Sequence, residues 1–220
     1  MKVVIFGATG MVGQGVLREC VLDAGVERVL CIGRKASGAS HPKVDDLIVP
    51  DPGNLSAVER QLNGFDACFF CLGVSSVGMN EVDYRRITYD LTLGAATTLA
   101  RLDPQMSFIY LSGAGTDSTE RGSSMWARVK GATENALMRL PFKATYMFRP
   151  GGIQPLHGVR SKTPLYNAIY VIASPLLGLL ARTAPRWFTT SEQVGRAMLV
   201  VARRGAPSPL VESIDINTLR

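Results

Sequence analysis

The chain has 220 residues, of which 46% are hydrophobic and 19% are charged. This length excludes a large multidomain assembly, and this composition excludes an intrinsically disordered chain. The formal net charge of +6 favours an anionic partner, such as a phosphorylated cofactor, a nucleic acid or a membrane face. The stretch between Glu134 and Glu192 contains basic but no acidic residues. We expect it to be a substrate lobe near cofactor phosphates, without nucleic-acid binding.

The cysteines and histidines do not have the spacing of a disulfide framework or a metal site. The cysteines lie in apolar runs without the spacing of a disulfide framework, and no signal peptide precedes them, which predicts reduced thiols in a cytoplasmic protein. Cys68 and Cys71 have the C-x-x-C spacing, but on an extended strand they face opposite sides. The two histidines are too few and too far apart for a histidine-based metal site, so we expect no metal.

Strands and helices alternate along the first half of the chain. Short apolar runs predict strands, and apolar residues at helical spacing predict helices. The expected elements are strand Lys2–Phe6, helix Met11–Ala24, strand Arg28–Ile32, strand Leu47–Val49, helix Leu55–Leu62 and strand Ala67–Leu72. The last strand is apolar throughout, which is typical of a parallel sheet covered by helices on both faces.

The alternation continues in the second half. The expected elements are helix Asp83–Leu102, strand Ser107–Leu111, helix Met125–Leu140, strand Ala144–Phe148, a helix from Thr190 and a short strand at Leu210–Val211. Thr189 and Glu192 have the spacing of a capping box for the last helix. The order predicts an α/β fold, a Rossmann-like doubly wound parallel sheet with helices on both faces. We expect a single domain over residues 1–220, with 151–189 forming a small substrate or interface lobe.

One apolar segment stands out within that lobe. Thr163–Ala181 carries no charge over 19 residues, which is near the length of a bilayer span. Asn167, Ser174 and Pro175 interrupt it, so we expect short helices that line a pocket or a subunit interface of a monomer or homodimer. An interfacial membrane contact helped by Trp187 is the alternative.

A glycine-rich turn follows the first strand, with the sequence GATGMVG. Its middle glycine would allow the backbone to approach a pyrophosphate, and its last glycine would let the helix pack closely on the strand. The helix N-terminus would then offer free N–H groups to the phosphates. The turn therefore predicts dinucleotide binding by Gly7, Thr9, Gly10, Met11, Val12 and Gly13.

The end of the second strand indicates which dinucleotide is bound. An NAD site usually has an acidic residue there, whereas this chain has Arg34 and Lys35. Because a guanidinium can bind a 2′-phosphate with two hydrogen bonds, we expect NADP rather than NAD. Asp51, after the third strand, could accept a hydrogen bond from the adenine amino group, or it could be a turn residue before Pro52.

These features together resemble the short-chain dehydrogenase/reductase superfamily in its atypical or extended branch. The glycine turn, the CFFCLG segment, LSGAG and FRPGGI are all similar to superfamily segments. The likeness extends to small bacterial proteins similar to the Tat-interacting-protein-like members, which are often labelled epimerase or dehydratase. It covers nearly the whole chain and implies that Leu72 and Gly73 run beside the cofactor.

The resemblance also implies a catalytic set. Ser112 matches the superfamily serine, which would hydrogen-bond a substrate oxygen, and Lys130 matches the lysine, which would hold the nicotinamide ribose. Trp126 occupies the tyrosine position, and Thr88 occupies the expected asparagine position. An indole N–H donates a hydrogen bond but does not ionise usefully, so the usual acid–base group is missing. Trp126 would be a packing residue.

Other phenols could replace the missing one. Tyr84 and Tyr110 are the candidates, although Tyr110 lies in a strand interior and is expected in the core. We therefore expect an NADP(H)-dependent oxidoreductase with weakened acid–base chemistry, acting on a small organic carbonyl or quinone substrate. The alternatives are a non-catalytic NADP(H)-sensing or scaffold protein and a nucleotide-sugar epimerase or dehydratase.

Overall fold

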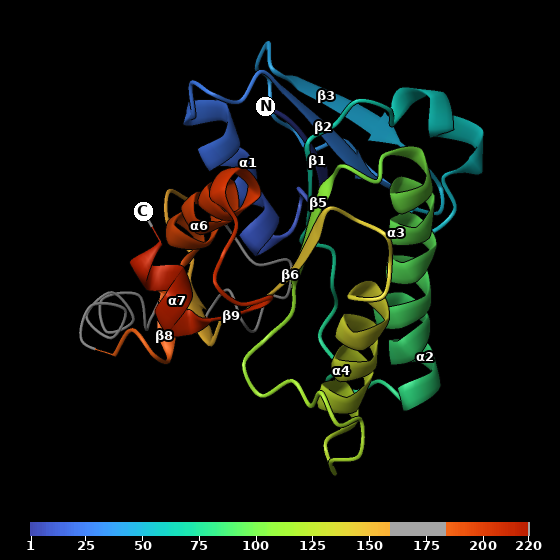
Figure 1. The fold of residues 1–220 in the computed structure, drawn as a ribbon, viewed down its shortest axis with the longest axis vertical. Coiled ribbons are helices and arrows are strands. Elements are labelled where there is room, and N and C mark those ends of the chain that lie inside the picture. The colour runs from blue at the N-terminus through green and yellow to red at the C-terminus, as the bar shows by residue number, and fades with distance from the viewer. Residues whose placement is uncertain (159–183, 220) are drawn as a thin grey trace.

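The fold is built around a parallel β-sheet (Figure 1). We describe it from a computed structural model, which places residues 1–158 and 184–219. The sheet has seven strands in the order β3-β2-β1-β4-β5-β6-β9, and each neighbouring pair is parallel. The strands are β1 Lys2–Phe6, β2 Arg28–Gly33, β3 Val44–Ile48, β4 Ala67–Phe70, β5 Ser107–Leu111, β6 Ala144–Arg149 and β9 Leu210–Glu212. The predicted doubly wound α/β sheet is confirmed.

Helices cover both faces of this sheet (Figure 1). Helices α1 (Met11–Leu22) and α6 (Ser191–Arg204) pack side by side on one face. The 3₁₀ helix Ser56–Gln61 together with α3 (Leu91–Leu102) and α4 (Met125–Leu137) covers the other. Among the described residues, no helix is both long enough and apolar enough to cross a bilayer.

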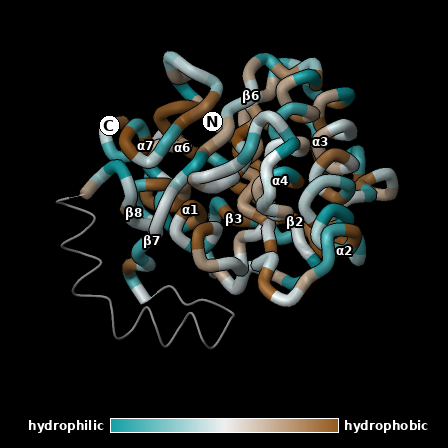
Figure 2. The backbone as a smooth tube through the Cα atoms, turned by 90° about the horizontal axis from the view of Figure 1, so that it is seen from below, coloured by the Kyte–Doolittle hydropathy of each residue, from teal (hydrophilic) through white to brown (hydrophobic). Residues whose placement is uncertain are grey.

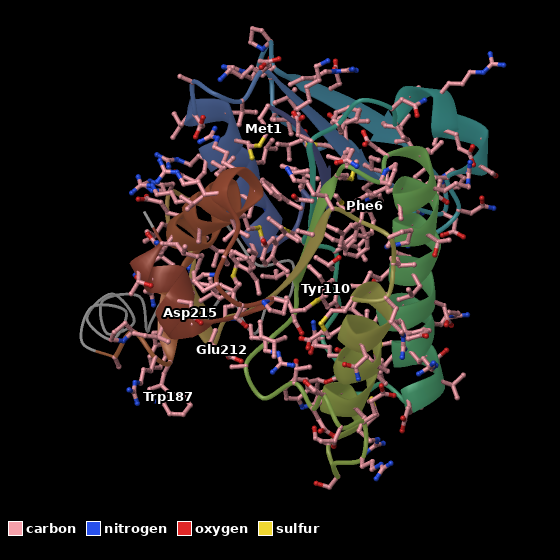
Figure 3. The ribbon with its side chains drawn as sticks, in the orientation of Figure 1. Met1, Phe6, Tyr110, Trp187, Glu212 and Asp215 are labelled. Carbon is pink, nitrogen blue, oxygen red and sulfur yellow. The ribbon has the colours of Figure 1, made fainter. Side chains whose placement is uncertain are left out.

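The period of two along each strand divides the core between the faces. Val3 and Ile5 of β1 pack with α1 and α6, whereas Val4 and Phe6 pack toward α3 and α4. Figure 3 labels Phe6 on the α3 and α4 side of the sheet. In Figure 2, α6 carries alternating brown and teal segments, as expected for a helix with one buried face. Because both faces are covered, β1 and β4 are almost wholly apolar.

The long helix expected over Asp83–Leu102 is interrupted. It consists of α2 (Glu81–Arg85), a π-helical turn at Arg86–Asp90, and α3. Asn80 begins it by accepting a hydrogen bond from the backbone N–H of Asp83, 2.9 Å away. The π turn contains neither proline nor glycine, so the sequence carries no local signal for it.

The start of α6 differs by one residue from the expected capping box. Thr190, rather than Thr189, is the N-cap, and its hydroxyl accepts from the backbone N–H of Gln193 at 3.0 Å. Three elements were not expected: strands β7 (Gly152–Gln154) and β8 (Phe188–Thr190), which pair in parallel, and helix α7 (Ser213–Thr218). The predicted lobe at 151–189 contains β7 and most of β8, while its apolar segment Thr163–Ala181 lies outside the described residues.

Candidate functional site

The glycine turn lies where strand order reverses, between β1 and β4 at the centre of the sheet. In doubly wound folds, ligands bind at the carboxyl ends of the strands beside this point. A side chain is excluded at two of its glycines. A Cβ on Gly7, whose φ is +80°, would lie 2.6 Å from the backbone nitrogen of Leu72, and one on Gly13 would lie 2.1 Å from the carbonyl oxygen of Gly7. The turn is therefore packed tightly against the end of β4.

The first turn of α1 follows directly. Gly10 is its N-cap and has no side chain that could cap the helix, and the next residues, Met11, Val12 and Gly13, have no acidic group. The N–H groups and the positive end of the helix dipole are therefore available to an anion. The backbone N–H of Gly10 donates to the Gly7 carbonyl at 2.9 Å, and Gln14 Nε2 donates to the Thr9 carbonyl at 3.1 Å, so the loop conformation is held. These residues fit a pyrophosphate.

Leu72 and Gly73 run from the end of β4 past this turn. The backbone N–H of Cys71 donates to the carbonyl of Phe6 at 2.9 Å, which continues the pairing of β4 with β1 beyond the last strand residue. Leu72 is half-buried and Gly73 is exposed. The segment lies where a cofactor bound at the glycine turn would pass.

Arg34 and Lys35 follow the last residue of β2, beside β1 in the sheet. Both are exposed, and within the described residues no acidic side chain forms an ion pair with either. Since the carboxyl ends of β1 and β2 are neighbours, both cations lie at the edge that carries the glycine turn. Their charge is available to a ligand phosphate.

Asp51 has a structural partner. Its Oδ1 accepts a hydrogen bond from the backbone N–H of Gly53 at 2.9 Å, and its carbonyl accepts from that of Asn54 at 3.1 Å. This is the turn alternative expected from the sequence. A Cβ on Gly94 of α3 would lie 2.4 Å from the Gly53 carbonyl oxygen, so the turn also packs against a helix. The carboxylate remains exposed.

Ser112 and the ammonium of Lys130 both lie at the carboxyl end of β5. Ser112 follows the last residue of that strand, and the Lys130 ammonium donates to the carbonyl of the preceding residue, Leu111, at 3.4 Å. Lys130 Nζ also lies 5.2 Å from the centre of the Tyr110 ring. Burial lowers the pKa of Lys130 to about 8, and the negative charge of Glu134 partly opposes this. The lysine therefore changes charge near neutral pH.

Trp126 is on α4, one helical turn before Lys130, and packs against the loop after Ser112. A Cβ on Gly115 would lie 3.5 Å from Cη2 of its indole. Gly115 has a φ of +85°, a conformation that favours glycine. The indole thus covers the loop that carries Ser112. Thr88, at the expected asparagine position, is buried in the π-helical turn.

Neither alternative phenol is suited to proton transfer. Tyr84 and Tyr110 are 2% and 1% exposed, and burial raises the pKa of both. The pKa of Tyr110 is raised further by the nearby Tyr84 and Glu134. The expectation that Tyr110 belongs to the core is confirmed, and Figure 3 labels it beside α4.

Two features near Ser112 and Lys130 were not anticipated. The hydroxyl of Thr116 lies 3.0 Å from that of Ser112, and both residues are buried. Glu134, one turn after Lys130 on α4, forms a buried ion pair with Arg149 of β6. A short polar residue in a glycine-rich loop carries no distinctive pattern. The ion pair joins elements far apart in the sequence, so the contact has no local signal.

The chain has curated relatives but matches no protein-family model. It is 26% identical over 204 residues to fmp52 of Emericella nidulans, which is named a mitochondrial protein, and covers 89% of this chain and 84% of that one. It is 29% identical over 153 residues to HTATIP2 of Rattus norvegicus, covering 68% of this chain and 62% of that one. The expectation of a cytoplasmic protein is wrong by this comparison, because the FMP52 relatives are named as mitochondrial.

Solved structures share the fold at low identity. WbmF of Bordetella bronchiseptica, solved in complex with NAD+, superposes with a TM-score of 0.68 and 16% identity over 99% of this chain and 76% of that one. A UDP-N-acetylglucosamine 4-epimerase from Methanobrevibacter ruminantium superposes with a TM-score of 0.67 and 15% identity over 92% and 73%. The FMP52 and HTATIP2 relatives, together with this shared fold, are consistent with the resemblance to the atypical branch of the short-chain dehydrogenase/reductase superfamily.

Proposed function

We propose that the protein is an NADP(H)-dependent oxidoreductase that acts slowly on a small organic carbonyl or quinone substrate. The observation that carries this proposal is the position of Lys130 beside the end of β5, with its ammonium on the carbonyl of Leu111 and Ser112 next in sequence. The glycine turn and Arg34 follow β1 and β2 of the same parallel sheet, so all these groups belong to one edge.

Each group has a distinct task at that edge. The N-terminus of α1 would bind the pyrophosphate, and Arg34 would bind the 2′-phosphate with two parallel hydrogen bonds. Lys130 would donate to the nicotinamide ribose, and Ser112 would hydrogen-bond the substrate oxygen. Bound NADPH would supply a hydride. Several of the solved structural neighbours are complexes with NAD+ or NADH, and the preference for NADP here rests on Arg34 and Lys35 alone.

The protein side of the reaction lacks an efficient proton donor. Trp126 cannot deliver a proton to a developing alkoxide, and Tyr84 and Tyr110 are buried with raised pKa values. A positioned acid–base group typically contributes about 10²–10⁴-fold to such a step. Cofactor binding would therefore be retained while carbonyl reduction is slow. Quinones would react best, because they can accept hydride before the proton arrives.

The test is a pair of measurements on the unmutated protein. Titration followed by the fluorescence of NADPH measures binding, and loss of NADPH absorbance in the presence of aldehydes, ketones and quinones measures turnover. We expect binding, measurable quinone reduction and slower carbonyl reduction. A failure to bind NADPH would refute the proposal, and binding without any turnover would refute its enzymatic part.

A second candidate is a non-catalytic NADP(H) sensor. The contact of Trp126 with Gly115 favours it, because the indole packs on the loop after Ser112 and occupies the sequence position of the superfamily tyrosine. Binding without turnover would support this reading. An epimerase or dehydratase, the activities named for several structural neighbours, has less support because that chemistry also relies on the missing phenol.

A further inference from the structure

The hydroxyls of Ser112 and Thr116 form an ordered chain of hydrogen bonds. The Thr116 hydroxyl donates to the carbonyl of Gly113 at 2.8 Å. The Ser112 and Thr116 hydroxyl oxygens lie 3.0 Å apart. Each hydroxyl has one proton, and a carbonyl oxygen can only accept. Because the proton of Thr116 is used on Gly113, the bond between the two hydroxyls takes the proton of Ser112.

The surrounding loop holds this direction in place. Ser112 and Thr116 are each 8% exposed, so water has little access to exchange partners with them. The backbone N–H of Ser112 donates to the carbonyl of Phe148 at 2.7 Å, and that of Ala114 donates to Pro150 at 2.9 Å, which fastens the loop to β6 and the residues after it. Reversing the direction would remove the shorter of two hydrogen bonds to the Gly113 carbonyl, which would keep only the backbone N–H of Thr116 at 3.2 Å.

This direction decides what Ser112 can offer a ligand. The hydroxyl proton of Ser112 is donated to Thr116, so toward a ligand the Ser112 oxygen can only accept a hydrogen bond. A carbonyl oxygen has no proton to give, whereas a hydroxyl group has one. We propose that the site recognises the hydroxyl-bearing member of a carbonyl–alcohol pair, and that Thr116 is the positioning residue that makes Ser112 an acceptor. The ligand class is a small alcohol.

The inference rests on the proposed function, since it assigns a ligand to the same site. It also agrees with slow carbonyl reduction, because a ketone would have to displace the Ser112 proton from Thr116 before binding. One neutral hydrogen bond contributes about 0.5–1.5 kcal/mol, so the alcohol should bind about threefold to tenfold more tightly than its ketone.

The experiment is ligand binding to the NADP+-saturated protein, measured by calorimetry with two matched pairs: cyclohexanol against cyclohexanone, and 1-phenylethanol against acetophenone. We expect each alcohol to bind at least about threefold more tightly than its ketone. In Thr116→Val, which removes the acceptor and frees the Ser112 proton, the preference should disappear or reverse. Thr116→Ser keeps a hydroxyl and should retain it.

Each outcome has a defined meaning. Equal or ketone-favouring affinities in the unmutated protein would overturn the inference, as would a preference that survives Thr116→Val or binding of neither pair. The preference of the unmutated protein and of Thr116→Ser keeps the test valid should Thr116→Val fold poorly. A separate NADP+ titration of each protein distinguishes the two proposals: if NADP+ itself does not bind, the proposed function fails and this inference fails with it.

Discussion

Arg149 holds the carboxylate of Glu134 in the core of the protein, one turn along α4 from Lys130. The guanidinium Nε lies 3.0 Å from Glu134 Oε1, and a second nitrogen binds the other carboxylate oxygen. The Glu134 side chain is fully buried, and hydrogen bonding to it raises the pKa of Arg149. The pair joins α4, which carries Trp126 and Lys130, to β6.

Breaking this pair should destabilise the fold strongly. Arg149→Met leaves the Glu134 charge buried and uncompensated, so we expect the free energy of unfolding to fall by about 3–5 kcal/mol. Arg101→Met is the matched control, because Arg101 pairs with Glu59 at the surface and should contribute less than about 1 kcal/mol. Urea unfolding of both variants measures the difference. Equal effects would show that the buried pair does not hold α4.

Cofactor selectivity should depend on Arg34. We expect NADPH to bind at least about tenfold more tightly than NADH, which corresponds to about 1.4 kcal/mol, and Arg34→Asp to erase or reverse this preference. Arg204→Asp is the control for net charge: it is exposed at the C-terminal end of α6, where Arg203 binds Asp23 at the end of α1, opposite to the glycine turn. Fluorescence titration gives the dissociation constants of NADPH and NADH. Equal affinities for the two cofactors in the unmutated protein would contradict the assignment of NADP as the cofactor.

The pH dependence of cofactor binding should report Lys130. Its pKa is about 8, below the ordinary value because of burial, so the side chain is an ammonium below this pH and a neutral amine above it. An ammonium attracts the anionic cofactor more strongly than an amine does. We expect the NADPH dissociation constant to rise as pH increases through about 8, and Lys130→Met to bind more weakly without this rise. The same pH dependence in both proteins would rule out Lys130 as its source.

A phenol at position 126 should increase the rate of carbonyl reduction. Trp126→Tyr places a phenol one helical turn before Lys130, and we expect carbonyl reduction to increase by up to about 10²-fold while NADPH affinity changes little. Trp126→Phe removes the indole without adding an acid and is the control for pocket size. NADPH oxidation across a carbonyl panel measures both. Fast turnover by the unmutated protein that is lost in Tyr84→Phe or Tyr110→Phe would show instead that another phenol acts.

Local patterns were sufficient for much of the fold. Most strands of the central sheet could be placed because they are short apolar runs, and the glycine turn could be interpreted because strand, turn and helix are contiguous. Strand β3 is the exception: it spans Val44–Ile48 rather than the expected Leu47–Val49, because Asp45 and Asp46 interrupt its apolar pattern. The π turn at Arg86–Asp90 could not be predicted, since no proline or glycine marks it. The pairing of β7 with β8 depends on residues more than thirty positions apart, which is beyond the reach of a local pattern.

The candidate site likewise has residues that the sequence could predict and residues that it could not. Gly7, Gly13 and Arg34 follow strands whose ends meet at one edge, so parallel topology alone brings them together. Thr116 could not be predicted as a site residue, because its role depends on which hydroxyl donates in the hydrogen bond between Ser112 and Thr116. The contact between Trp126 and Gly115 depends on how α4 packs over that loop, which no spacing in the sequence specifies.

A crystal structure of the protein with NADPH tests the central claim most directly. The account predicts the pyrophosphate at the first turn of α1, the 2′-phosphate within hydrogen-bonding distance of Arg34, and the nicotinamide ring facing Ser112 beside the indole of Trp126. It would be contradicted by a 2′-phosphate that contacts neither Arg34 nor Lys35, or by a nicotinamide ring bound away from Ser112.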